Sequence, residues 1–293
     1  MRMALRIGAS LFAAVAATSL TSPAVSKPVE IGIGVSDNLG SRVTQILEQH
    51  PDVCAQDDFF SEKWLRTSLE FVIVCRAIRM GGLDATYRIY SFPNSARTRV
   101  ELLKGTTAIM VDLPWGNFAE QEGLYRSDAV LRIGDFVKGV YTRPDHTELL
   151  KVRTLEELRK FKGVSSKTWV YDWAALERMK IETFTVSTYS LMGRMVEKGR
   201  VDFLVGEFPG TENLSQYING FRFIPVPGIK IALPGSRHVA VSKRAPHAER
   251  IFDALQIGLK IMREKGLIKK GYRTVGFLNP LIEDWKVLCC YEE

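Results

Sequence analysis

Two stretches of the chain follow one plan: a helix end, Lys-Gly, two further residues and an apolar strand. They are ELLKGTTAIMV (101–111) and RMVEKGRVDFLV (194–205), and their lysines, Lys104 and Lys198, are 94 residues apart. Each lysine falls in a last helical turn, where a cation complements the helix dipole. A helix that feeds an apolar strand through so short a link is half of a parallel β-α-β unit. Two such units predict two similar α/β lobes.

Periodicity elsewhere supplies the other elements of both lobes. Alternating or apolar runs predict strands at 29–35, 85–90, 106–113, 163–165, 183–186, 221–233 and 238–242. Helical spacing predicts helices at 62–79, from 95, 169–179, from 187 and 248–265, and 36–61 reads as polar and irregular. Thr154 and Glu157 form a capping-box signature. Gly258 lies on the apolar side of the last helix, where it would allow a close neighbour.

The first 26 residues have the pattern of a secretory signal peptide. Arg2 and Arg6 precede an apolar stretch from Ile7 to Leu20, and Ala24-Val25-Ser26 supplies small residues for cleavage. The stretch is shorter than the roughly 20 residues of a spanning helix, although an uncleaved anchor is the alternative. We expect a periplasmic protein that begins near Lys27.

Composition excludes several classes of function. Without the first 26 of the 293 residues, 267 remain and the net charge falls from +7 to +5, because Arg2 and Arg6 are lost. The basic residues are scattered and no nucleic-acid motif is present, so we expect no nucleic-acid partner. There is no Cys-x-x-Cys spacing, and the four histidines are dispersed, so we expect neither a metal nor a cofactor.

Four cysteines, Cys54, Cys75, Cys289 and Cys290, permit disulfides in an exported protein. Neighbours such as Cys289 and Cys290 rarely bond to each other. A bond from the tail to Cys54 or Cys75 and a bond between Cys54 and Cys75 therefore stay equally open.

Four segments together resemble a known family, the type 2 periplasmic solute-binding proteins, and within it the extracellular family 3 group. They are YRSDAVLRIGDFVKGVYTRPD (125–145), VRTLEELRKFKGVSSKT (152–168), MVEKGRVDFLVGE (195–207) and HVAVSKRAPHAERIFDALQIGLKIMREKG (238–266). Their order and spacing cover most of the chain after residue 26. The resemblance implies an α/β, two-lobed fold with two crossing strands as a hinge. Lobe one would comprise 27–139 and 238–293, and lobe two 140–237.

The resemblance also implies a ligand cleft at the carboxyl ends of the parallel strands, where open α/β sheets bind ligands. Glu207 ends the strand whose terminal acid contacts a ligand amino group in the amino-acid binders. Those binders also place an arginine after the strand that ends here at Leu113, but this chain has Pro114-Trp115-Gly116 and no arginine before Arg126. An α-amino acid ligand is therefore in question.

Eight residues are candidates for the ligand site, and most of them have a plainer structural alternative. Trp115 and Trp169 would stack on ligand, or Trp115 would only pack. Ser166 and Thr168 would present hydroxyls, or would only cap a helix. Arg143, Arg237 and Asp37 would reach the ligand, or the arginines would only hold the hinge. Glu207 would meet a ligand cation, or would pair with Arg143 or Arg237.

The leading interpretation is a monomeric, non-catalytic receptor that closes on a small polar solute and presents it to the membrane permease of an ABC-type importer. One alternative is an enzyme on the same scaffold, similar to prephenate or arogenate dehydratases. The sequence has no Ser-His-Asp order, no paired acids near a histidine and no cofactor loop. A second alternative is a sensory or interaction subunit with a degenerate cleft.

Overall fold

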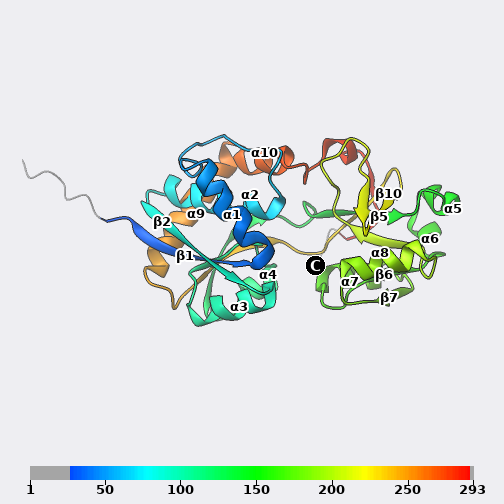
Figure 1. Cartoon of the computed structure of the whole chain (residues 1–293), viewed down its shortest axis with the longest axis horizontal. Helices are drawn as coiled ribbons and strands as arrows, with labels where there is room; N and C mark the ends of the chain where they lie inside the picture. Colours follow the sequence, from blue (N-terminus) through cyan, green and yellow to red (C-terminus); the bar gives the residue numbers. More distant parts are fainter. Residues whose placement is uncertain (1–26, 291–293) are drawn as a thin grey trace, which may run out of the picture.

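The computed structural model describes residues 27–290 and shows two α/β lobes, each built on its own sheet (Figure 1). The first sheet has the order β2-β1-β3-β12-β4, and the second runs β13-β11-β5-β8-β6-β7. The first sheet contains β1 (Val29–Ser36), β2 (Ala85–Phe92), β3 (Ile109–Met110), β4 (Leu124–Leu131) and β12 (Arg237–Ser242). The second contains β5 (Val137–Thr142), β6 (Gly163–Ser165), β7 (Thr183–Thr185), β8 (Phe203–Gly206), β11 (Ile229–Ala232) and β13 (Lys286–Val287), with β10 (Phe221–Pro225) pairing β5 and β9 (Gln216–Ile218).

The two sheets share one topology. In the first, β1 is parallel to β2 and to β3, and β12 is antiparallel to β3 and to β4. In the second, β6 is parallel to β7 and to β8, and β5 is antiparallel to β8 and to β11. In each sheet, the strand that has just crossed from the other lobe is thus inserted beside the third parallel strand. The prediction of two similar α/β lobes is confirmed.

The repeated Lys-Gly motif occupies the equivalent place in both lobes. It joins α3 (Ser95–Lys104) to β3 and α8 (Tyr189–Glu197) to β8. Gly105 has φ 82° and Gly199 has φ 66°, a left-handed conformation that ends a helix most readily when no Cβ is present. The motif therefore sets the direction in which β3 and β8 enter their sheets.

Helices cover the faces of the sheets (Figure 1). In lobe one they are α1 (Asp37–Gln49), α2 (Arg66–Met80), α3, α4 (Gly116–Ala119), α9 (Ala248–Glu264) and α10 (Leu267–Thr274). In lobe two they are α5 (Thr147–Leu150), α6 (Leu155–Leu158), α7 (Val170–Arg178) and α8, with a short 3₁₀ helix at Pro280–Ile282 near the tail. The capping box at Thr154 and Glu157 starts α6 as predicted. Among residues 27–290, no helix combines the length and the apolar character needed to cross a membrane.

We expected the segment 36–61 to be irregular, but α1 occupies its first half. Leu39, Val43 and Ile46 are spaced at four and three residues and are buried on one face of this helix. The other positions in α1 are mostly polar, so the segment as a whole is polar and its apolar stripe was missed.

Helix α2 is the buried centre of lobe one, with every residue from Ser68 to Ile78 buried. It packs so closely on α9 that a Cβ at Gly258 would lie 1.7 Å from the carbonyl oxygen of Ala77. The close neighbour expected at Gly258 is therefore the backbone of α2 itself.

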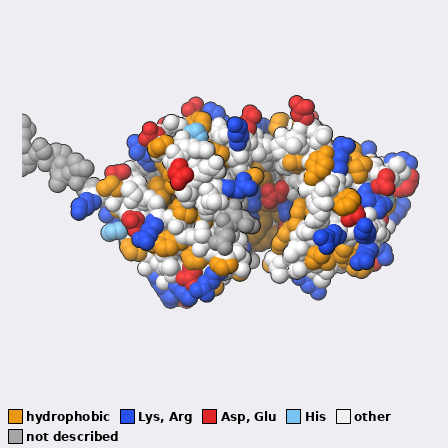
Figure 2. Space-filling model, in the orientation of Figure 1, with side chains coloured by type: hydrophobic (Ala, Val, Ile, Leu, Met, Phe, Trp, Pro, Cys, Tyr) orange, Lys and Arg blue, Asp and Glu red, His pale blue; other side chains and the backbone are white. Residues whose placement is uncertain are grey.

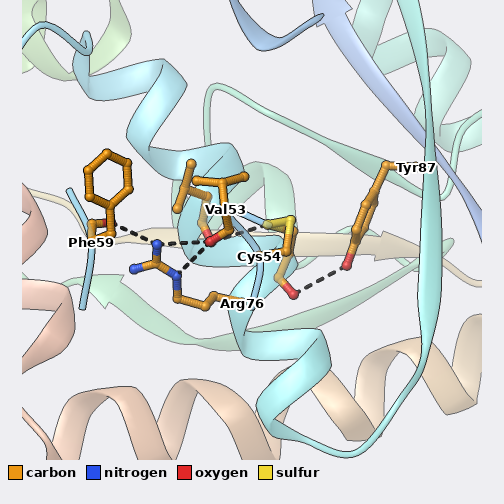
Figure 3. Close-up of a disulfide and its surroundings, with 7 residues drawn as sticks. Val53, Cys54, Phe59, Arg76 and Tyr87 are labelled. Atoms are coloured by element: carbon orange, nitrogen blue, oxygen red, sulfur yellow. Dashed lines mark hydrogen bonds between the residues drawn. A yellow bond between two sulfur atoms is a disulfide. The ribbon is translucent and has the colours of Figure 1, made fainter. Parts of the chain in front are cut away.

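Arg76 and a disulfide fasten the loop after α1 to α2 (Figure 3). The Arg76 guanidinium donates to the carbonyl oxygens of Val53, at 2.9 and 3.2 Å, and of Phe59, at 2.7 Å. Burial lowers the pKa of Arg76 to about 10. The Cys54–Cys75 disulfide joins the same two segments, so the loop is held to the helix by one covalent bond and by several charge-assisted hydrogen bonds.

The second disulfide joins the neighbours Cys289 and Cys290, a pairing we regarded as rare. The tail lies against the second sheet, where β13 is parallel to β11 and the N–H of Ala232 donates to the carbonyl of Cys289. Cys54 and Cys75 are bonded to each other, as one of the two open pairings predicted, so neither is available to the tail. The boundaries at 139 and 238 remain a prediction, although β13 adds to the lobe-two sheet while 238–293 was expected in lobe one.

Candidate functional site

The candidate site lies where the strands of both sheets end toward the gap between the lobes. Glu207 directly follows β8, Asp112 follows β3, and Arg237 opens β12. Figure 2 shows that this face of the molecule is hollowed between the lobes, with acidic and hydrophobic side chains inside the hollow. On the lobe-one side, a cavity of about 810 Å³ borders Ser36, Leu65 and Asp112.

Glu207 meets a cation of the other lobe. Arg66, the first residue of α2, places its Nε 3.3 Å from Glu207 Oε2, and its Nη2 lies 3.5 Å from Oε1. Burial raises the pKa of Glu207, but the charges of Arg66, Lys138 and Arg237 outweigh it and hold that pKa below its usual range. The carboxylate is therefore ionised at neutral pH, and it is 40% exposed. The partner of Glu207 is neither Arg143 nor Arg237, the two considered from the sequence.

Arg66 is shared among three carboxylates. Besides Glu207, it contacts Glu70 at 2.7 Å and Asp112 at 3.7 Å. Glu70 has no exposed surface, and it also accepts from the backbone N–H of Leu113 at 3.0 Å and from the hydroxyl of Tyr272 at 3.4 Å. Glu70 therefore fixes Arg66 from within lobe one, and the rest of the guanidinium is directed toward the cleft.

Arg237 is the second cation of the site. Its Nη2 donates to Asp112 at 2.8 Å, and its guanidinium lies 4.6 Å from the ring centroid of Trp115. Its Nε is buried and has no hydrogen-bond partner. Burial raises the pKa of Asp112, but Arg237 and Arg66 outweigh it and lower that pKa overall. This second arginine reaches the cleft from the crossing segment.

Aromatic rings form the side of the site near the hinge. Trp115 stacks on Tyr171 of α7, with ring centroids 4.2 Å apart and planes 24° apart. Phe136, in the other crossing segment, lies 5.2 Å from Trp115 and 5.4 Å from the Arg66 guanidinium. Trp115 thus packs between the lobes beside Arg237, as its structural alternative predicted, and its stacking on a ligand stays a prediction.

The lobe-two side contains a buried ion pair and two aromatic residues. Lys138 Nζ lies 2.5 Å from Asp172 and 5.2 Å from the ring centroid of Trp169. Trp169 is half-buried and lies 5.9 Å from the ring of Tyr189, whose pKa is raised by burial and by the charge of Glu207. Trp169 therefore belongs to the lobe-two wall that faces Glu207.

The remaining predicted residues are dispersed. Ser166 is buried and its Oγ lies 2.8 Å from that of the exposed Thr168, so the two hydroxyls are engaged with each other before α7 begins. Arg143 does not lie at the hinge. It sits at the far end of β5 from Glu207, because β5 and β8 are antiparallel, and it contacts Asp145 and the carbonyl of Glu197. Asp37 begins α1, and its side chain is outside the described part of the chain.

Several residues of the site were missed in the sequence, among them Arg66, Glu70, Asp112 and Lys138. Two of them carried a signal, because Arg66 and Glu70 are four apart at the start of a helix whose following residues are apolar. Within residues 27–290, no three His, Cys, Asp or Glu side chains gather in a way that could hold a metal ion.

The same two-lobed arrangement occurs in solved structures. The chain is similar to the probable amino-acid ABC transporter extracellular-binding protein ytmK from Bacillus subtilis, with TM-score 0.56, 11% identity, and 85% of this chain and 100% of that chain covered. It is similar to substrate-binding domain 2 of Lactococcus lactis GlnP in its open conformation, with TM-score 0.53, 14% identity, and coverage of 85% and 96%. It is also similar to the VFT2 domain of Bordetella pertussis BvgS, in a double mutant, with TM-score 0.52, 15% identity, and 83% of this chain and 92% of that chain covered.

The chain has the fold of type 2 periplasmic solute-binding proteins. At these identities the likeness establishes the fold alone. No family profile matches the sequence, and no curated protein matches it. In this type 2 fold, Asp112 and Glu207 follow the carboxyl ends of β3 and β8, where ligands of open α/β sheets bind, and Arg66 and Arg237 contact them there.

Proposed function

We propose that this protein is a non-catalytic, monomeric, periplasmic receptor that captures a small polar solute between its lobes and delivers it to the permease of an ABC-type importer. In this proposal, residues 1–26 direct export and are removed. The two-lobed fold supports the proposal, and so does the extracellular-binding protein of a probable amino-acid ABC transporter among the similar structures.

The single observation that carries the proposal is the Arg66–Glu207 pair, which brings one cation and one carboxylate of opposite lobes together in the cleft. A solute with both an anionic and a cationic group would replace this internal pair, with its anion on Arg66 and Arg237 and its cation on Glu207. Each charge would then be met by a group already ionised. In this proposal, Arg66 of α2 would take the role of the arginine that the sequence lacks after Leu113.

Closure follows from the same geometry. The lobes join through two crossing segments, so a solute that contacts Arg66 and Glu207 would bridge both lobes and favour the closed state. Trp115 and Phe136 would exclude water near the charges, which strengthens their interaction with the solute.

A thermal-shift screen tests this proposal. Purified protein is heated with amino acids, polyamines, organic acids or sugars, since a bound solute raises the melting temperature by mass action. We expect solutes with both charges to stabilise the protein, and Glu207→Gln to weaken the effect. The matched control is Glu264→Gln, a change to an exposed carboxylate in α9.

A second candidate is a sensory or interaction subunit with a degenerate cleft, favoured by the fact that the chain's own Arg66 already occupies Glu207. Stabilisation by no class of solute would support this candidate. Turnover of a prephenate-like acid, lost in Glu207→Gln, would instead support an enzyme.

A further inference from the structure

A second cavity, of about 360 Å³, borders residues 130–137, which lead from β4 into β5, and its lining includes none of Arg66, Asp112, Glu207 and Arg237. Its walls come from both lobes: β4, α9 and α10 on one side, and β5, β11 and the segment around Ile282 on the other. The volume falls within the range of sites for small ligands. The cavity is therefore large enough for a small molecule, and such a molecule would contact both lobes.

The lining is strongly cationic. It includes five basic residues and only two acidic ones, Asp135 and Glu283, so its formal net charge is +3; the basic residues are Arg132, Lys230, Arg263, Lys269 and Arg273. Glu283 is already paired with Arg273 at 3.2 Å, which leaves one carboxylate beside four cations. A low-dielectric recess with this balance attracts anions.

Two of these cations are built into the wall. Lys230 is buried and donates from Nζ to the carbonyls of Ile282, at 2.6 Å, and Glu283, at 3.0 Å. Arg263 donates to the carbonyls of Ala129 and Val130. Burial lowers the pKa of Lys230, and burial together with the charge of Arg132 lowers that of Arg263. These cations are bonded only to neutral carbonyls, and no carboxylate of the described residues forms an ion pair with either of them.

Arg132 and Lys269 complete the cavity from its rim. Both are exposed, and they extend from the end of β4 and from α10 respectively. Their side chains form no ion pair with another described residue. They are thus placed to contact a molecule that enters, with the charges of Lys230 and Arg263 behind it.

We propose that this cavity binds a small oxyanion that carries two or more negative charges, such as a phosphate compound or a polycarboxylate. The anion takes hydrogen bonds from Arg132 and Lys269 and is attracted by Lys230 and Arg263. Because the walls belong to both lobes, the bound anion links them at the hinge. Tyr272, which lines the cavity, donates its hydroxyl to Glu70 of the candidate site.

Calorimetric titration with pyrophosphate and with citrate, at one fixed ionic strength, tests the site, and sodium acetate serves as the monovalent control. We expect pyrophosphate, citrate or both to bind, and acetate to give no binding. Pyrophosphate alone would assign phosphate chemistry, and citrate alone would assign polycarboxylate chemistry. No binding of either at millimolar concentration would overturn the proposal.

The double variant Arg132→Gln/Lys269→Gln locates the binding. Both side chains are exposed, so the fold is retained, and the loss of two charge-assisted contacts is expected to weaken binding at least about tenfold. The control variant Lys160→Gln/Arg200→Gln removes the same charge from exposed positions in lobe two. Equal affinity in the cavity variant and wild type, or an equal loss in the control variant, would show that the anion binds elsewhere.

Discussion

Arg66 at the start of α2 lies 3.3 Å from Glu207 at the end of β8, and so joins two lobes through residues 141 positions apart in the sequence. The two partners are held very differently. Arg66 is fixed by the fully buried Glu70 within its own lobe, whereas Glu207 is 40% exposed. This asymmetry makes Arg66 part of the lobe-one core and Glu207 the partner that is free to exchange Arg66 for a solute.

The asymmetry predicts unequal costs of substitution. Arg66→Met leaves the buried carboxylate of Glu70 without its cation, and we expect the free energy of unfolding to fall by about 3 kcal/mol. Glu207→Gln removes a partly exposed partner, and we expect a loss below about 1 kcal/mol. Urea unfolding of both variants measures the difference. Equal losses would show that Glu70 does not depend on Arg66.

Stability should fall in acid through the carboxylates of the cleft. Arg237 and Arg66 hold the pKa of Asp112 below its unfolded value despite the opposing effect of burial. Its stabilising contribution is therefore complete above the unfolded pKa of about 3.9 and is lost as the pH falls through the folded pKa. We expect Asp112→Asn to flatten the decline of unfolding free energy below about pH 4. An equal flattening in Asp145→Asn, at the far end of β5, would contradict this assignment.

The Cys54–Cys75 disulfide should contribute far more stability than the Cys289–Cys290 disulfide. The first closes a loop between residues 21 apart, whereas the second joins neighbours. In the chain-entropy account, Cys54→Ser/Cys75→Ser lowers the free energy of unfolding by about 3 kcal/mol. The Cys289–Cys290 disulfide closes almost no loop, so the variant Cys289→Ser/Cys290→Ser is the matched control. Denaturant unfolding under oxidising conditions compares the two, and the reverse ranking would refute the expectation.

The contact between α2 and α9 should not tolerate a single added methyl group. At Gly258 a Cβ would meet the Ala77 carbonyl oxygen at 1.7 Å, so the helices must separate. We expect Gly258→Ala to destabilise the protein by about 1 to 3 kcal/mol. At Gly123 a new Cβ would make only an ordinary contact, with Leu103 at 3.8 Å. Thermal unfolding measures the effect of both substitutions. If Gly258→Ala and Gly123→Ala both have the melting temperature of the wild type, α2 and α9 are not packed as closely as this contact requires.

Local sequence predicted much of the fold, because the elements of both lobes have clear periodicity. The Lys104-Gly105 and Lys198-Gly199 motifs predicted two equivalent strands, β3 and β8. Helix α1 was missed because its apolar stripe of Leu39, Val43 and Ile46 is narrow among polar residues.

The site was harder to predict, because its charges come from distant segments. Glu207 follows β8 and Arg237 begins β12, two strands whose ends could be located in the sequence, and the structure places both residues in the charged group. Arg66 begins a helix, and only the tertiary fold brings it to Glu207. Arg143 was also predicted at the passage between the lobes, but it follows β5, whose antiparallel pairing with β8 places it at the opposite end of these strands from Glu207.

The most direct test of the central claim is calorimetric titration of the purified protein with the solute that stabilises it most in the thermal-shift screen. If that solute binds between Arg66 and Glu207, its affinity falls at least about tenfold in Glu207→Gln, through loss of a charge-assisted contact, and stays unchanged in Glu264→Gln. Equal affinity in Glu207→Gln and wild type would contradict the placement of the solute in this cleft.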